Sequence, residues 1–138
     1  MKQYELICLD ELVGKNHNYR KFLDIWSFKF ADKKLKKLEK DNPHKGYGLP
    51  ILFRCLILQF MEDLSDREME RYLQENTAGK WFCNLALGEK SPDHSYFGDF
   101  RKRLGTKRLM DVFSQVRNSL KDMGLIREVF TFVNGQLK

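Results

Sequence analysis

The residues best suited to specific chemistry lie in one segment, 91–105, in which small polar side chains come first and cations come last. Asp93 or Ser95 can begin a helix there, because short polar side chains accept hydrogen bonds from the free amides of a helix start. The apolar residues that follow are three and four positions apart, which predicts that one face of this helix is buried. They are Phe97, Phe100 and Leu104.

The end of this helix and the turn after it are rich in cations. Basic side chains bind the phosphates of a nucleic acid, and polar groups at a helix start can donate to a phosphate as well. Basic side chains further along such a helix can reach base edges. The alternative is a solvated helix end whose cations complement the helix dipole. We predict a DNA-binding surface that consists of His94, Ser95, Tyr96, Arg101, Lys102, Arg103, Lys107 and Arg108.

A bundle of helices is expected to position this segment. Residues 50–63 are apolar on nearly every side, which is typical of a helix in the middle of a bundle, and Pro50 suits its first turn. Ser65 and Glu68 have the spacing of a capping box, so the next helix is expected to begin there and to run to about Glu75. Further helices are predicted over 16–30 (one helix or two), 31–40, 77–83, 93–104 and 106–123.

The predicted fold class is all-α. We expect a small multi-helix bundle with a helix-turn-helix-like unit and one short C-terminal β-strand or extended tail, because 128–133 is the segment richest in β-formers. Residues 65–104 supply the helix-turn-helix-like unit, although the loop over 84–92 is long for the tight turn of that motif. Gly105 is expected to end its last helix, and Thr106 to cap the long helix that follows.

The net charge is +6 at pH 7, and the cations gather toward both ends of the chain. Residues 1–50 hold 11 basic and 7 acidic side chains, residues 51–90 hold 5 and 7, and residues 91–138 hold 9 and 5. An excess of this size is a weak indication of nucleic-acid binding by itself. A second basic run, 33–40, can contact phosphates, but we favour a solvated helix face there.

The cysteines do not have the spacing of a metal site. Cys8, Cys55 and Cys83 are odd in number and far apart, whereas zinc needs close Cys or His pairs and a secreted scaffold needs an even set. We expect free thiols, no metal or other cofactor and no small-molecule substrate. Because no apolar run can span a membrane and the first residues do not have signal-peptide character, a cytoplasmic protein is expected.

Several short motifs follow one another in a fixed order along the chain. They are Leu9-Asp10-Glu11-Leu12-Val13 with His17, Leu56-Ile57-Leu58-Gln59-Phe60 with Leu64-Ser65-Asp66-Arg67-Glu68, Trp81-Phe82, Pro92-Asp93-His94-Ser95 and Phe100-Arg101-Lys102-Arg103-Leu104-Gly105. Together they resemble the N-terminal region of bacterial insertion-sequence transposases of the DDE type. The likeness covers roughly Leu9 to Val133. One departure is Gly48-Leu49-Pro50, where the family pattern has Gly-Arg-Pro, so one basic contact is missing.

The resemblance implies that residues 1–126 form a helical DNA-binding domain that recognises the terminal inverted repeats of the element and helps to assemble the synaptic complex. In the full-length family, an RNase H-like domain follows, whose two Asp and one Glu hold two divalent metal ions, such as Mg²⁺, for strand cleavage. Residues 127–138 resemble the first strand of that domain, and Asn134 stands where its first Asp is expected. An amide is a poorer ligand for Mg²⁺ than a carboxylate.

We therefore expect a DNA-binding domain of a truncated insertion-sequence transposase, with double-stranded DNA as partner and no strand-cleavage activity. One alternative is an interaction module that forms a homodimer or pairs with full-length transposase and inhibits it. In that interpretation helix 106–123 and strand 129–133 expose apolar surface that the catalytic domain would cover. Another alternative is a decayed remnant without a selected role.

Overall fold

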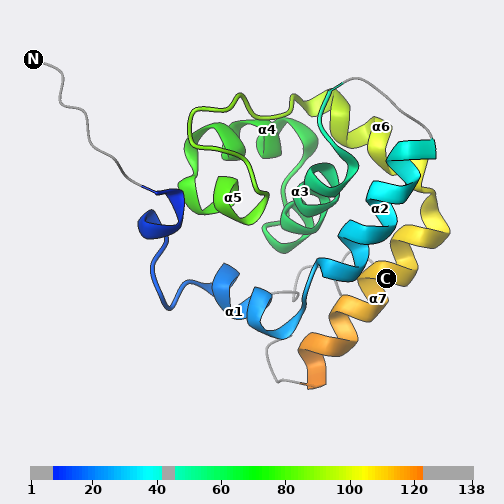
Figure 1. Ribbon diagram of the computed structural model, residues 1–138, viewed down its shortest axis with the longest axis horizontal. Helices are drawn as coiled ribbons and strands as arrows, with labels where there is room; N and C mark the ends of the chain where they lie inside the picture. The colour runs from blue at the N-terminus through cyan, green and yellow to red at the C-terminus, as the bar shows by residue number, and fades with distance from the viewer. Residues whose placement is uncertain (1–7, 42–45, 123–138) are drawn as a thin grey trace, which may run out of the picture.

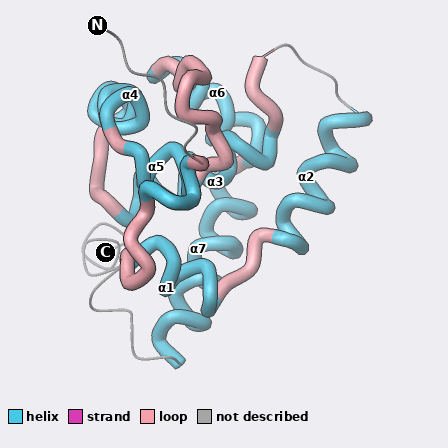
Figure 2. The backbone as a smooth tube through the Cα atoms, turned by 60° about the vertical axis from the view of Figure 1, so that its left-hand side comes forward, coloured by secondary structure: helices cyan, strands magenta, loops and turns pink. Residues whose placement is uncertain are grey.

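The computed structural model describes residues 8–41 and 46–122, which form a bundle of helices around one central helix (Figure 1). The predicted all-α class is confirmed, and the described part of the chain contains no strand (Figure 2). The strand expected at 128–133 and the tail around Asn134 lie outside the described residues. In chain order the elements are a 3-10 turn η1 (Leu9–Leu12), α1 (Asn18–Ile25), α2 (Lys29–Asp41), α3 (Leu49–Met61), α4 (Asp66–Glu75), α5 (Thr77–Phe82), α6 (His94–Leu104) and α7 (Thr106–Asp122).

The central helix is α3, as its sequence predicts. Pro50 lies in its first turn, where the missing amide hydrogen costs no hydrogen bond. Burial of each large apolar side chain stabilises the fold by about 1.5–3 kcal/mol, so α3 is a major source of stability. Its most completely buried residues are Cys55, Leu56, Ile57 and Leu58.

Aromatic rings join α3 to the helices around it. The ring of Phe28 packs edge-on against Phe53 of α3 and Phe82 of α5, with centroids 5.9 and 5.6 Å apart. The Arg54 guanidinium lies 4.2 Å from the Phe28 ring centroid and 3.1 Å from the Asp32 carboxylate. The segment before α2 and the first turn of α2 are thereby fixed to the core.

The region 16–30, predicted as one helix or two, contains one short helix, α1, and the first residues of α2, which continues through the helix predicted over 31–40. α1 ends at Ile25, because Trp26 takes up an extended conformation with ψ of 119°. The break allows the rings of Trp26 and Phe28 to meet edge-on, 4.8 Å apart, inside the core. A continuous helix would place residues two positions apart on different faces.

The N-terminal motif is attached to α5. Asp10 accepts hydrogen bonds from the Trp81 indole at 3.0 Å and from Arg20 at 3.1 Å. The Arg20 guanidinium also lies over the Trp81 ring, 4.5 Å from its centroid. Two motifs that are 71 residues apart in the sequence thus form one contact.

The helix ends follow the predicted caps with one correction. Ser65 and Glu68 form both hydrogen bonds of the capping box, at 3.2 and 3.0 Å. Gly105 ends α6, as expected, with a φ of +85° that disfavours residues with a side chain. The prediction that Thr106 caps α7 was wrong, because Thr106 is the first helical residue and the Gly105 carbonyl accepts from Leu109.

No helix in the described ranges has the length and apolar character that crossing a membrane requires.

Candidate nucleic-acid interface

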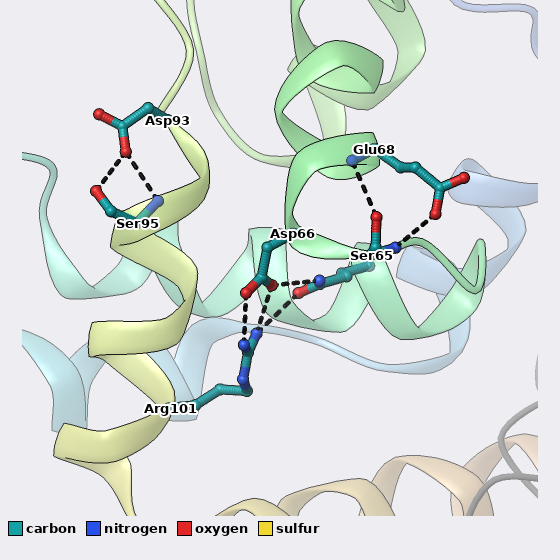
Figure 3. A network of polar contacts seen from close by, with 7 residues as sticks. Ser65, Asp66, Glu68, Asp93, Ser95 and Arg101 are labelled. Carbon is teal, nitrogen blue, oxygen red and sulfur yellow. Dashed lines mark hydrogen bonds and ion pairs between the residues drawn. The ribbon is translucent and has the colours of Figure 1, made fainter.

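The start of α6 is held by two carboxylates. Asp93 caps the helix by accepting from the Ser95 amide at 2.8 Å and from the Ser95 hydroxyl (Figure 3). Glu70 of α4 accepts from the His94 amide at 2.8 Å, and its carboxylate lies 3.2 Å from the His94 ring. These bonds hold the pKa of Glu70 and of Asp93 below the usual range. The amides of His94 and Ser95 therefore already have acceptors, both of them anionic, and do not offer free donors to a phosphate.

The same three residues bring potential metal ligands together. One ligand atom each from Glu70, Asp93 and His94 lies within 4.8 Å of the others. The carboxylates are engaged by the amides of α6, and the three side chains lie partly or fully in solvent. We assign this cluster to helix capping.

Arg101 ties the middle of α6 to α4. Its guanidinium donates to both carboxylate oxygens of Asp66 at 2.8 and 2.7 Å, and to Gln59 of α3 at 3.3 Å (Figure 3). These hydrogen bonds lower the pKa of Asp66, and they raise that of Arg101. An arginine with two oxygens in this geometry is fixed in place. Arg101 thus orients α6 and is not turned outward.

Tyr96 also contacts other residues of the protein. Its ring stands at 88° to the ring of Tyr47, with centroids 5.3 Å apart, and it lies against Gly46. The Tyr47 hydroxyl in turn donates to the Lys90 carbonyl in the loop before α6. Tyr96 therefore joins α6 to the segment before α3.

Four of the predicted residues form an exposed basic corner where α6 meets α7. The residues 101–108 contain five cations and no acid. All four corner side chains are exposed, and none belongs to an ion pair among the residues that the structure describes. The bend at Gly105 brings the two helix ends together. The basic corner consists of Lys102, Arg103, Lys107 and Arg108.

A groove of about 260 Å³ opens beside the basic corner. Arg103 and Arg108 are the cations that line it. The rest of its lining is apolar and comes from three helices: Leu35 and Leu38 of α2, Leu49 of α3, and Phe100 and Leu104 of α6. Two arginine side chains and an apolar surface thus line the same groove.

The eight residues predicted for DNA binding fall into two sets. His94, Tyr96 and Arg101 contact neighbouring elements and position α6, and Ser95 is bound to its own cap. The other four are the basic corner. Sequence reasoning placed all eight on one helix and turn, but it had no signal for the partners Glu70 and Asp66, which come from α4.

One comparison with known proteins finds a match for this chain. Residues 7–103 match the family model described as Transposase domain (DUF772). The match spans η1 to the end of α6 and covers more than half of the chain. No curated protein and no solved structure matches the chain.

The family match over residues 7–103 identifies this helical part of the chain as the N-terminal region of a transposase, as the sequence motifs predicted. The chain belongs to the transposase-domain family named above, and its function is related to that of transposases.

Proposed function

We propose that this chain binds double-stranded DNA through the basic corner, and that its target is the terminal inverted repeat of an insertion sequence. The observation that carries the proposal is the contrast along α6. Arg101 is neutralised by Asp66, whereas the four cations after it are exposed and unpaired within the described residues. Such cations attract phosphates and release counterions on binding.

The helices around the basic corner hold α6, and with it the cations of the corner, in a fixed position. α6 is fixed at its start by Glu70, in its middle by Asp66 and on its apolar face by the core around Phe97 and Phe100. A basic residue on a fixed helix loses less conformational freedom on binding than one on a free loop. In this proposal α4 and α6 are the two main helices of a helix-turn-helix-like unit, with α6 nearest to the duplex.

In this proposal the described helices bind DNA but do not cleave its strands. The described carboxylates that come closest to a metal-binding arrangement, Glu70 and Asp93, lie at the start of α6, away from the basic corner, and act as caps of this helix. A labelled duplex incubated with the protein and Mg²⁺ is expected to stay intact. Cleaved strands would contradict this part of the proposal.

Gel retardation with the inverted repeats that flank the coding sequence tests the binding role. We expect the repeat duplex to be retarded at low salt, and a scrambled duplex to require more protein. The variant R103Q/R108Q should lose most of the retardation. The control K15Q/K21Q removes the same charge from exposed side chains outside the basic corner, and it should bind like the wild type. Absence of retardation at low salt would refute the proposal.

A further inference from the structure

The charges of α2 are divided between its two sides. Asp32 faces α3, where it pairs with Arg54 at 3.1 Å, and Glu39 accepts from the Leu49 amide at 2.8 Å. Asp32 and Glu39 are therefore used at the contact with α3. The lysines of α2 are all exposed: Lys29, Lys33, Lys34, Lys36, Lys37 and Lys40. The outer face of α2 is thus more cationic than its sequence composition suggests.

Helical spacing divides these lysines between two flanks. Lys34 and Lys37 are three positions apart and lie beside Leu38, which lines the groove. Lys36 and Lys40 lie on the opposite flank, which continues toward Glu39 and α3. The pair Lys34 and Lys37 and the pair Lys36 and Lys40 thus carry equal charge but lie on different flanks of α2.

An aromatic side chain accompanies the groove-side flank. Phe30 is 68% exposed, which is a large apolar exposure for a phenylalanine. The Lys34 ammonium lies 4.5 Å from the centroid of its ring. Because Phe30 is four residues before Lys34, it belongs to the same flank. A cation is attracted to the face of an aromatic ring, so Phe30 helps to hold the Lys34 ammonium on this flank.

The groove places this flank opposite the basic corner. Leu35 and Leu38 of α2 form one of its walls, and Arg103 and Arg108 stand on the other. Residues of α2, α6 and α7 thus line this one groove. Cations therefore border the groove on both sides.

We propose that the groove-side flank of α2, formed by Phe30, Lys34 and Lys37, is a second contact to the same DNA duplex, with Lys34 and Lys37 on its phosphates. The inference rests on the proposed function, because it extends the surface that begins at the basic corner. The duplex lies across the groove and touches both borders. A solvated helix face, the sequence-based interpretation of this run, requires no difference between the two flanks of α2.

Fluorescence anisotropy with a labelled DNA duplex of random sequence tests the proposal. K34Q/K37Q should weaken binding roughly tenfold at low salt and lower the slope of log affinity against log salt by about 1.8, since each phosphate contact contributes about 0.9. K36Q/K40Q removes the same charge from the same helix, and it should leave the slope unchanged. All four substituted lysines are exposed, so thermal unfolding should be the same in both variants.

The outcomes separate this inference from the proposed function. Equal loss in the two lysine variants shows a general effect of net charge, and it overturns the inference. So does wild-type affinity in K34Q/K37Q when R103Q/R108Q still fails to bind, a result that leaves the basic corner intact as the DNA site. A wild-type protein that does not bind any duplex overturns both.

Discussion

The Arg101 guanidinium spans the interface between α6 and α4 and donates one hydrogen bond to each carboxylate oxygen of Asp66, at 2.8 and 2.7 Å. Arg101 belongs to the basic run that sequence analysis assigned to DNA, yet it is the member of that run with an ion pair inside the protein. Its neighbours at 102 and 103 are exposed. Adjacent cations of one helix thus have separate tasks, one structural and the others available for a ligand.

Substitution of Arg101 should affect folding more than DNA binding. Both side chains of the pair are about two-thirds buried, so R101Q should lower the free energy of unfolding by about 1–2 kcal/mol, between the values of surface and buried pairs. Arg103→Gln serves as the matched control and should leave stability within about 0.5 kcal/mol. Chemical denaturation of the two variants measures the difference. Equal stability would show that the ion pair contributes nothing.

The same pair predicts how stability depends on pH. The pKa of Asp66 is lowered in the folded protein, chiefly by the hydrogen bonds from Arg101. Its stabilising contribution is therefore complete above the ordinary Asp pKa of 3.8, and it is lost as pH falls through the lower folded value. D66N should unfold more easily than the wild type at neutral pH, and the gap should narrow in acid. A gap that widens as pH falls would contradict this account.

Gly105 fixes the angle of the basic corner through its backbone. Its φ of +85° is unfavourable for any residue with a Cβ, although nothing lies within 4 Å of the place that a Cβ would occupy. Gly105→Ala should therefore cost about 1–3 kcal/mol through backbone strain alone. Gly88→Ala also adds a methyl group in open space, but at a φ outside that region, and it should be nearly neutral. Thermal unfolding compares the two, and equal effects would exclude backbone strain as the cause.

A buried tyrosine connects the first helix to the core. The Tyr19 hydroxyl donates to Glu62 at 2.5 Å and contacts the Tyr72 hydroxyl. Burial and these contacts raise the pKa of Tyr19, so it stays protonated at every physiological pH. Y19F should lower the free energy of unfolding by about 1–2 kcal/mol, because the other two groups lose their partner. Chemical denaturation of Y19F, Y72F and the double variant measures the effect, and the two single losses should not add, because both remove the same hydroxyl contact.

Local signals predicted much of this structure. The apolar surface of α3, Pro50 in its first turn, the capping box at Ser65 and the glycine after α6 each depend on residues close in the sequence, and each is present. The partners of Arg101, His94 and Tyr96 were not predictable in this way. They come from other elements, and nothing near these residues in the sequence reveals which side of α6 meets α4.

The charge distribution on α2 shows the same limit. Its run of lysines indicated a solvated face, and these lysines are exposed, but composition does not show that Asp32 and Glu39 turn toward α3. Likewise, the contact between Asp10 and Trp81 explains why two distant motifs occur together. The sequence alone does not reveal this contact, because the two residues are brought together by the fold. Sequence patterns located the basic residues, and the packing of the helices determined which of them are exposed.

The central claim is that the basic corner binds duplex DNA through phosphate contacts, and the salt dependence of that binding tests it most directly. Affinity for the inverted-repeat duplex should fall linearly on a log–log plot against salt. Removal of Lys102, Arg103, Lys107 and Arg108 by substitution with Gln should make the slope shallower by about 3.6, from about 0.9 per contact, in a protein that unfolds at the wild-type temperature. An unchanged slope in that folded variant would contradict the account.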